Sequence, residues 1–304
     1  MPTQLTGQLA ALGTAGCWAA STLAFDAACQ RIGSLTVNML RLVIAFVLLA
    51  GACQLLRGRA LPLDATAHAW LWLALSGLVG FAFGDLCLLR AYAFIGPRLS
   101  ALMMSLAPPM TAAIGWLLLG ERLSPRQLLG MALTVGGIAV AILERPRTEA
   151  APASLETSGG HRVAGVALGA GGALGQAGGL VLSKLGMGSY DPVAATQVRV
   201  LAGIAAYVVL LFALGWWPRV QASLGDRAAL GWTSAGAFFG PFLGVSLSLF
   251  AVQRTLAGVA ASLMATTPIL VIPGVVLLRG ERVGWGGLAG TAVAVGGVAL
   301  LFLG

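Results

Sequence analysis

Charged side chains are scarce in this sequence of 304 residues, because Asp, Glu, Lys and Arg together make up only 9% of it. A soluble domain carries roughly a quarter charged residues, so this chain could not cover a water-facing surface. Hydrophobic residues reach 58%, and a bilayer offers lipid rather than water to the outer side chains. The composition therefore excludes an ordinary soluble protein and predicts an all-α integral membrane protein.

The sequence also lacks a basic face. Its net charge of +8 could by itself suggest a nucleic-acid partner. The Arg residues are, however, spread one or two to a connection, as at Arg57 and Arg59, which is typical of anchors at the ends of membrane helices. We therefore expect a surrounding lipid bilayer and no nucleic-acid partner.

Residues that carry catalysis or hold metals are few. The two histidines, His68 and His161, lie at a segment edge and in a polar connection, and the four cysteines show no close spacing of the kind that holds zinc. We find no Walker-type Gly-Lys-Ser/Thr sequence, no nucleophile motif and no paired carboxylates within an apolar segment. We therefore expect no cofactor, no metal site, no ATP drive within this chain and no enzyme.

Long apolar runs fill most of the chain, and a spanning helix needs about 20 mostly apolar residues. Ten segments meet this condition, approximately residues 7–25, 36–56, 69–89, 98–118, 126–143, 163–184, 193–214, 230–251, 258–278 and 285–303. One longer connection is polar and rich in Pro, Ser, Glu and Gly, which predicts a flexible linker. The predicted organisation is a first five-helix repeat over residues 1–143, a linker over 144–162 and a second five-helix repeat over 163–304.

The two predicted halves repeat one another. The matches at an offset of 160 residues include Gly120-Glu121-Arg122 with Gly280-Glu281-Arg282, Pro108 with Pro268, Met104 with Met264, and Gly136-Gly137 with Gly296-Gly297. Because each half has an odd number of helices, the second half must enter the membrane in the opposite orientation. The sequence thus predicts ten transmembrane helices as two inverted five-helix repeats, a recurrent architecture of secondary transporters whose binding site lies where the halves meet.

Motifs in both halves carry a resemblance to a known family. They are Gly16-Cys17-Trp18, Leu99 to Pro108, Leu118 to Ser124, Gly136-Gly137, Lys184, Ala260 to Pro268 and Leu278 to Arg282. The chain resembles the drug/metabolite transporter superfamily of the EamA type over nearly its whole length. The resemblance implies two repeated five-helix domains, a carrier of amino acids, other metabolites or drugs that is often an exporter, and both termini in the cytoplasm. The positive charges do not support that orientation, since six Lys or Arg would lie in cytoplasmic connections and ten in outer ones.

Asp85 lies inside an otherwise apolar segment. A carboxylate at such a depth is costly and usually faces a cavity or a partner. One hypothesis makes Asp85 the ligand of a substrate amine or a proton-coupling site. The structural alternatives are an ion pair with Arg90 or Arg41, or a place close to the membrane interface. The repeat counterpart of Asp85 is Val245, so either role is confined to one half.

Prolines interrupt the predicted helices at corresponding places, at Pro108, Pro109 and Pro268. Proline removes a backbone hydrogen bond, and the freed carbonyl groups need partners that only a protein interior or a wet cavity supplies. A broken helix beside the substrate and a kink that serves packing are both consistent with this pattern. The neighbouring substrate-binding candidates are Met104, Ser105, Met264 and Thr267.

Trp18 and Gln176 correspond to one another at an offset of 158 residues. An indole could stack on an apolar solute and an amide could bind its polar end, with core packing as the alternative. Ser21 and Ser246 are weaker candidates of the same kind.

Arg41 and Arg199 also correspond at an offset of 158 residues, each about two turns inside its predicted helix. We interpret both as side chains that snorkel to the head groups, with anion binding as the alternative. Glu121 and Glu281 lie at short turns, and we interpret them as turn and cap residues rather than proton carriers.

These patterns predict a secondary transporter that exports amino acids or other small metabolites or drugs across the cell inner membrane, by alternating access around a central cavity. The expected partners are a small-molecule substrate and the bilayer, with protons as a candidate coupling ion through Asp85. Two alternatives stay open: an intramembrane enzyme acting on lipid, and a passive channel, although no polar ring for a pore is visible.

Overall fold

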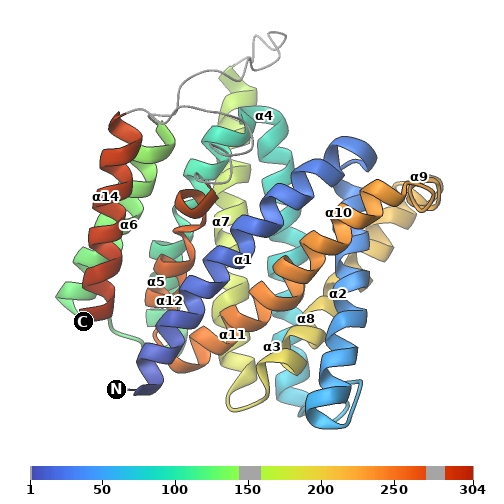
Figure 1. Ribbon diagram of the computed structural model, residues 1–304, viewed down its shortest axis with the longest axis horizontal. Helices are drawn as coiled ribbons and strands as arrows, with labels where there is room; N and C mark the ends of the chain where they lie inside the picture. The colour runs from blue at the N-terminus through green and yellow to red at the C-terminus, as the bar shows by residue number, and fades with distance from the viewer. Residues whose placement is uncertain (1, 144–158, 272–284, 304) are drawn as a thin grey trace.

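The structure is a computed structural model that describes residues 2–143, 159–271 and 285–303, and every regular element in those ranges is a helix (Figure 1). In chain order the elements are α1 (Pro2–Ile32), α2 (Ser34–Arg57), α3 (Ala67–Gly77), the π-helix η1 (Leu78–Gly84), α4 (Asp85–Met104), α5 (Ala107–Leu119), α6 (Pro125–Leu143), α7 (Gly159–Met187), α8 (Pro192–Ala213), α9 (Trp217–Ser223), α10 (Arg227–Ala237), the π-helix η2 (Phe238–Gly244), α11 (Val245–Arg254), α12 (Ala257–Met264) and α14 (Trp285–Leu303). The all-α prediction is confirmed for the described part of the chain.

Eight helices among the described residues are long and apolar enough to cross a membrane. They are Ser34–Arg57, Ala67–Gly96, Leu99–Leu119, Pro125–Leu143, Arg162–Met187, Pro192–Ala213, Arg227–Arg254 and Trp285–Leu303. The first predicted segment falls in α1, a helix of 31 residues outside this set, and the ninth falls on a shorter apolar helix, Ala257–Val271. A multi-pass membrane protein is therefore confirmed, whereas the number of ten spans stays a prediction.

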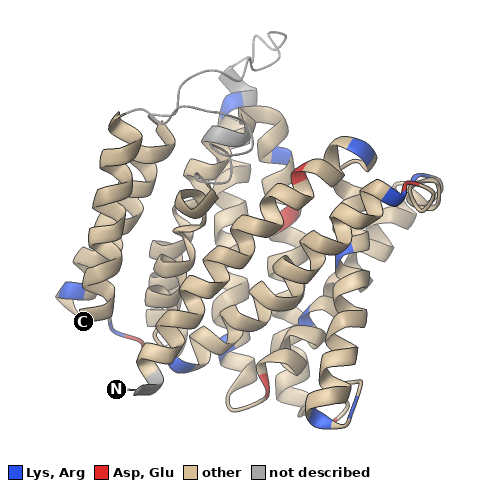
Figure 2. Cartoon of the chain, viewed as in Figure 1, with Lys and Arg blue, Asp and Glu red and all other residues tan. Residues whose placement is uncertain are grey.

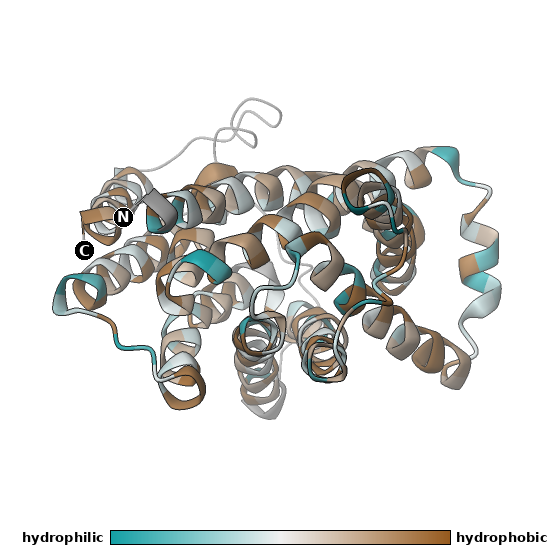
Figure 3. Cartoon of the chain, turned by 90° about the horizontal axis from the view of Figure 1, so that it is seen from below, coloured by the Kyte–Doolittle hydropathy of each residue, from teal (hydrophilic) through white to brown (hydrophobic). Residues whose placement is uncertain are grey.

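The outer surface of the bundle is apolar. Large hydrophobic side chains such as Val47, Leu117 and Phe212 are exposed in the middle or at the outer faces of long helices, Leu117 to 70%. The helices are coloured mostly brown to white, and the hydrophilic teal lies mainly at turns and helix ends (Figure 3). Most Lys and Arg residues likewise lie near the two ends of the bundle (Figure 2). This distribution fits a lipid-facing surface between two charged ends.

The repeat seen in the sequence is also a repeat of secondary structure. The π-helices η1 and η2 begin and end at positions that are equivalent under the 160-residue offset, and so do α3 and α10, and α6 and α14. Helices α3 and α10 even begin with equivalent caps. Thr66 accepts a hydrogen bond from the backbone N–H of Ala69, and Asp226 accepts one from that of Ala229. That backbone N–H group and the Arg31 guanidinium hold the pKa of Asp226 below its usual range.

Helices α6 and α14 occupy equivalent places in the two halves and pack side by side (Figure 1). Gly130 lies against Gly297, and Gly137 lies against Gly290, so the residue number rises in one helix as it falls in the other. The two helices therefore run antiparallel. This direction is the one that an inverted repeat requires, because equivalent helices must then cross the bilayer in opposite senses.

The first helix of each half packs against the other half. Helix α1 contacts α10, η2 and α11, while α7 contacts α3, η1 and α4 in the equivalent manner. Helices α2 and α8 pack on one another and complete the contact between the halves. The two repeats are thus interleaved, and neither half could bury its helices alone.

Both termini lie at one end of the bundle (Figure 1). The Gln8 side chain in α1 donates a hydrogen bond of 3.0 Å to the carbonyl oxygen of Leu301 in α14, which fixes this arrangement. Most of the predicted linker and the second copy of the Gly-Glu-Arg sequence, at 280–282, lie outside the described residues.

The α6–α14 crossing yields a stability prediction. A Cβ atom at Gly137 would lie 2.5 Å from the backbone nitrogen of Ala294 and the carbonyl oxygen of Gly290. We expect Gly137→Ala to lower the free energy of unfolding by about 1–3 kcal/mol, because two backbones must separate. Thermal unfolding of purified protein in lipid nanodiscs measures the change.

The neighbouring glycine provides the control. A Cβ atom at Gly136 would meet nothing within 4 Å. Gly136→Ala should leave the melting temperature unchanged or raise it slightly, because alanine favours a helix over glycine by about 1 kcal/mol. Equal effects of the two substitutions would contradict the close crossing.

Candidate functional site

Asp85 begins α4, directly after η1 and inside the helical span Ala67–Gly96. Its Oδ2 atom accepts a hydrogen bond from Arg41 Nη2 of α2 and forms an ion pair with it. Of the two partners expected from the sequence, the structure therefore assigns Arg41. The Arg41 guanidinium also lies 5.4 Å from the centroid of the Phe25 ring of α1. This cluster joins three helices by charge and by a cation–π contact.

Arg199 occupies in α8 the position that Arg41 occupies in α2. Its side chain is buried, with the residue exposed to only 6%, and its guanidinium lies 5.1 Å from the centroid of the Phe81 ring. The expectation that Arg199 snorkels to the head groups is therefore wrong. The side chain packs into the bundle instead because Gly80 of η1 leaves room for Nη2 there.

Three of the substrate-binding candidates lie where the first helix of each half crosses the π-helix of the other half. They are Trp18, Ser21 and Gln176. A Cβ atom at Gly244 would lie 2.8 Å from the Trp18 ring, and one at Gly240 would lie 3.3 Å from Ser21. In the equivalent crossing, Gly84 lies against the backbone of Gln176. Ser21 is buried and donates to the Trp18 carbonyl oxygen at 3.0 Å. Solute contact by these residues stays a prediction.

The residues beside the prolines sit at helix breaks. Helix α4 ends at Met104, and α12 ends at the equivalent Met264. Ser105 Oγ donates to the Leu102 carbonyl oxygen at 2.6 Å, and Thr267 Oγ1 donates to that of Met264 at 2.8 Å. Both hydroxyl groups thus satisfy backbone at the breaks. Met264 is buried in the apolar core and Met104 is half-buried.

Ser246 follows Val245, the counterpart of Asp85. Its Oγ atom is buried and has no hydrogen-bond partner among the described residues. A buried hydroxyl without a partner is costly. This atom is therefore a candidate contact for a polar group of a solute.

An ion pair connects three segments at the end of the bundle that carries the termini. Glu121, in the turn between α5 and α6, lies with Oε1 2.5 Å from Lys184 Nζ near the end of α7. Glu121 Oε2 accepts from the backbone N–H of Ala257 at 2.7 Å, and Lys184 donates to the Thr255 carbonyl oxygen at 2.5 Å. We call these four residues the Glu121–Lys184 bridge.

The bridge adds partners that the sequence does not reveal. The sequence predicts Glu121 as a turn and cap residue, and the resemblance singles out Lys184 without a partner. The Glu121 carboxylate does cap a helix, because it accepts from the backbone N–H of Ala257, the first residue of α12, and so joins the first half to the second. The sequence does place both residues at the ends of apolar segments, on the side of the membrane where the termini lie. Their pairing, however, depends on the packing of α5 against α7.

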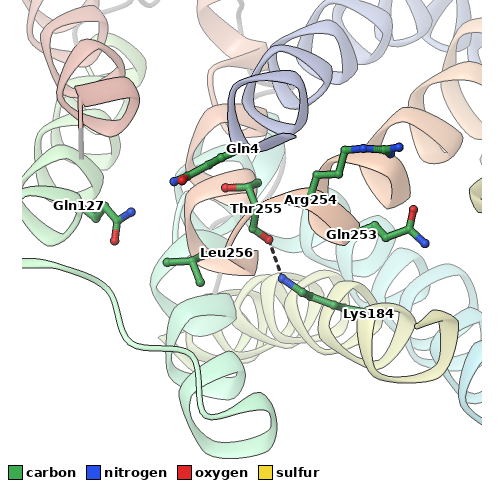
Figure 4. A pocket seen from close by; sticks show the side chains of 7 residues that line it. All are labelled: Gln4, Gln127, Lys184, Gln253, Arg254, Thr255 and Leu256. Atoms are coloured by element: carbon green, nitrogen blue, oxygen red, sulfur yellow. Dashed lines mark hydrogen bonds between the residues drawn. The ribbon is translucent and has the colours of Figure 1, made fainter. Parts of the chain in front are cut away.

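A shallow, open hollow of about 480 Å³ lies beside the bridge, at the same end (Figure 4). Its lining residues are Gln4, Gln127, Lys184, Gln253, Arg254, Thr255 and Leu256. The lining combines polar, cationic and apolar groups, and the Glu121 carboxylate balances Lys184. Among the described residues no three His, Cys, Asp or Glu side chains lie together as metal ligands would.

The repeated, interleaved membrane helices and their buried polar groups define a transporter-like membrane protein. The family model described as the EamA-like transporter family matches residues 5–143 and 163–303. The chain belongs to the EamA-like transporter family, as the resemblance in its sequence predicted.

Comparison with solved structures supports the same fold. One crystal structure, described only as that of a protein, superposes with a TM-score of 0.74 at 18% sequence identity, covering 99% of this chain and 97% of the other. At that identity the likeness concerns the fold alone. A comparison with curated proteins finds no match.

The Glu121–Lys184 bridge leads to a prediction about closure at this end. Lys184→Met removes the charged donor to the Thr255 carbonyl oxygen, and hydrogen bonds to charged groups contribute about 1.5–3 kcal/mol. Thr255 is buried beneath the bridge, so a cysteine placed there reports its opening. In a variant without the native cysteines, we expect Thr255→Cys to react with a maleimide about tenfold faster when Lys184 is Met.

Arg122 supplies the matched control, because it neighbours Glu121 and is exposed. Arg122→Gln should leave the rate of labelling at position 255 unchanged. If the cysteine at position 255 is labelled equally fast with Lys and with Met at position 184, the bridge does not hold this end closed.

Proposed function

We propose that the protein is a secondary transporter that exports amino acids or other small metabolites or drugs by alternating access. The family supports transport of small molecules, and the interleaved antiparallel repeats are the observation that carries the mechanism. Two such halves can rearrange about contacts that are equivalent at both membrane faces. The Glu121–Lys184 bridge supplies a contact that must break when the end with the termini opens.

We further propose that the protein lies in the cell inner membrane with both termini in the cytoplasm. The position of both termini at one end of the bundle supports a shared compartment. In this orientation the open hollow beside the bridge faces the cytoplasm, where an exported solute first meets the protein. Efflux from right-side-out vesicles, compared with uptake, measures the direction.

Counterflow tests the transport mechanism. We expect vesicles preloaded with an unlabelled substrate to accumulate the labelled substrate several-fold faster than empty vesicles, because a carrier returns loaded more readily than empty. The assay uses purified protein in liposomes and a panel of labelled amino acids and other small metabolites. A passive channel would give no such stimulation, and the appearance of modified lipid during incubation would instead favour an enzyme.

Protons are the proposed coupling ion, acting through Asp85 and its partner Arg41. We expect Asp85→Asn to abolish transport or to uncouple it from a proton gradient while expression stays intact, because the pair loses its titratable carboxylate. Transport rates in liposomes with and without a pH gradient measure this effect. Wild-type rates and wild-type gradient dependence in the Asn variant would remove Asp85 from the mechanism.

A further inference from the structure

The charges inside the bundle do not balance. The two halves contribute equivalent guanidinium groups, Arg41 from α2 and Arg199 from α8. Among the described residues, Asp85 is the carboxylate that forms an ion pair with one of these two guanidinium groups, and its partner is Arg41. At the position equivalent to Asp85 the second half carries the buried Val245. Arg199 is therefore left without the acid that Arg41 has, and the cluster of three residues carries one net positive charge.

The surroundings of Arg199 provide no substitute for that acid. Within the described ranges no carboxylate oxygen lies within 4.0 Å of its guanidinium, and its Nε atom is buried without an acceptor. The guanidinium contacts the ring of Phe81 on one side. On another side it contacts Gly80, where a Cβ atom added to the glycine would lie 3.3 Å from Nη2. The guanidinium is thus closely packed, and no acceptor in the described part of the chain takes its N–H groups.

Such a charge is expensive to keep. Removing an ion from water is costly even after the protein relaxes, and a cation–π contact offsets only part of that cost. Two further polar atoms of the same region lack partners in the described part of the chain, Arg41 Nε and the buried hydroxyl of Tyr207. Tyr207 belongs to the same apolar cluster as Phe81. Unpaired donors that share one apolar region point to a missing acceptor.

We infer that Arg199 binds a carboxylate of the transported solute, so that the protein carries organic monocarboxylate anions. Guanidinium donates two parallel hydrogen bonds to a carboxylate, and one anion brings the charge of the cluster to zero. A zwitterionic amino acid would add an ammonium group whose natural acceptor, Asp85, is already bonded to Arg41. Phe81 and its apolar neighbours suit the apolar part of such an anion. This inference rests on the transport function proposed above.

Pairs of anions and neutral isosteres test the inference. The wild-type protein in nanodiscs is mixed with acetate, benzoate or 3-phenylpropanoate, or with the matching amide, at equal ionic strength. We expect at least one carboxylate to raise the melting temperature by about 2–4 °C, as binding to the folded state does, and its amide to have no effect. Absence of a difference between every acid and its amide would overturn the inference.

Variants locate the effect. We expect Arg199→Gln to abolish the shift and Arg199→Lys to keep a smaller one, because lysine retains the charge but lacks the planar pair of donors. Arg219→Gln is the matched control, since Arg219 is exposed, stacks on Trp216 and is not one of the three charged residues Arg41, Asp85 and Arg199. An unchanged shift in Arg199→Lys or Arg199→Gln, or its loss in Arg219→Gln, would place the anion elsewhere.

Counterflow separates this inference from the proposed function. If carboxylates bind through Arg199 but no solute shows counterflow, the transport mechanism fails and the anion site stands. If neutral solutes show counterflow that carboxylates do not inhibit and that Arg199→Lys does not alter, the anion site fails and transport stands.

Discussion

Close approach of helix backbones is the constraint on which this structure depends. Lipid tails are as apolar as the side chains that face them, so membrane helices associate through packing and hydrogen bonds rather than by exclusion of water. Glycine permits that packing where equivalent helices meet, at Gly130 and Gly137 in α6 against Gly297 and Gly290 in α14. The same holds where α7 crosses η1, with Gly175 and Gly179 against Gly84 and Gly80. The abundance of glycine in the sequence has its physical cause in these crossings.

On this nearly symmetric frame the polar residues are asymmetric. Asp85 in the first half corresponds to Val245, and Lys184 in the second half corresponds to Asp26. The first difference places a charge in one half only, and the second places charges of opposite sign at equivalent positions. The Glu121–Lys184 bridge therefore strengthens closure at the end with the termini, while the single carboxylate leaves Arg199 different from Arg41. Symmetric packing lets the halves move in equivalent ways, whereas asymmetric charge makes the two resulting states unequal in energy.

Much of the fold could be predicted from the sequence, because long apolar runs and a constant offset between the two halves can be recognised without any knowledge of packing. The pairing of charges could not. Asp85 had two plausible partners, and only the approach of α2 to the start of α4 selects Arg41. Arg199 sits two turns inside its helix like a snorkelling side chain, and its burial depends on space at Gly80. The π-helices were also unforeseen, since apolar and glycine-rich sequence allows either helical hydrogen-bond pattern.

The equivalent positions of the two π-helices indicate when in evolution this feature arose. A π-helix closes its hydrogen bonds one residue further along the chain than the α-helix around it, so insertion of one residue into an α-helix can produce it. The 160-residue offset is the same before η1 and η2, at the caps Thr66 and Asp226, as after them, at Met104 and Met264. Separate insertions after duplication would have had to fall on the same turn twice. The widened turn is therefore most simply an inheritance from the ancestral single unit, older than the two-fold protein itself.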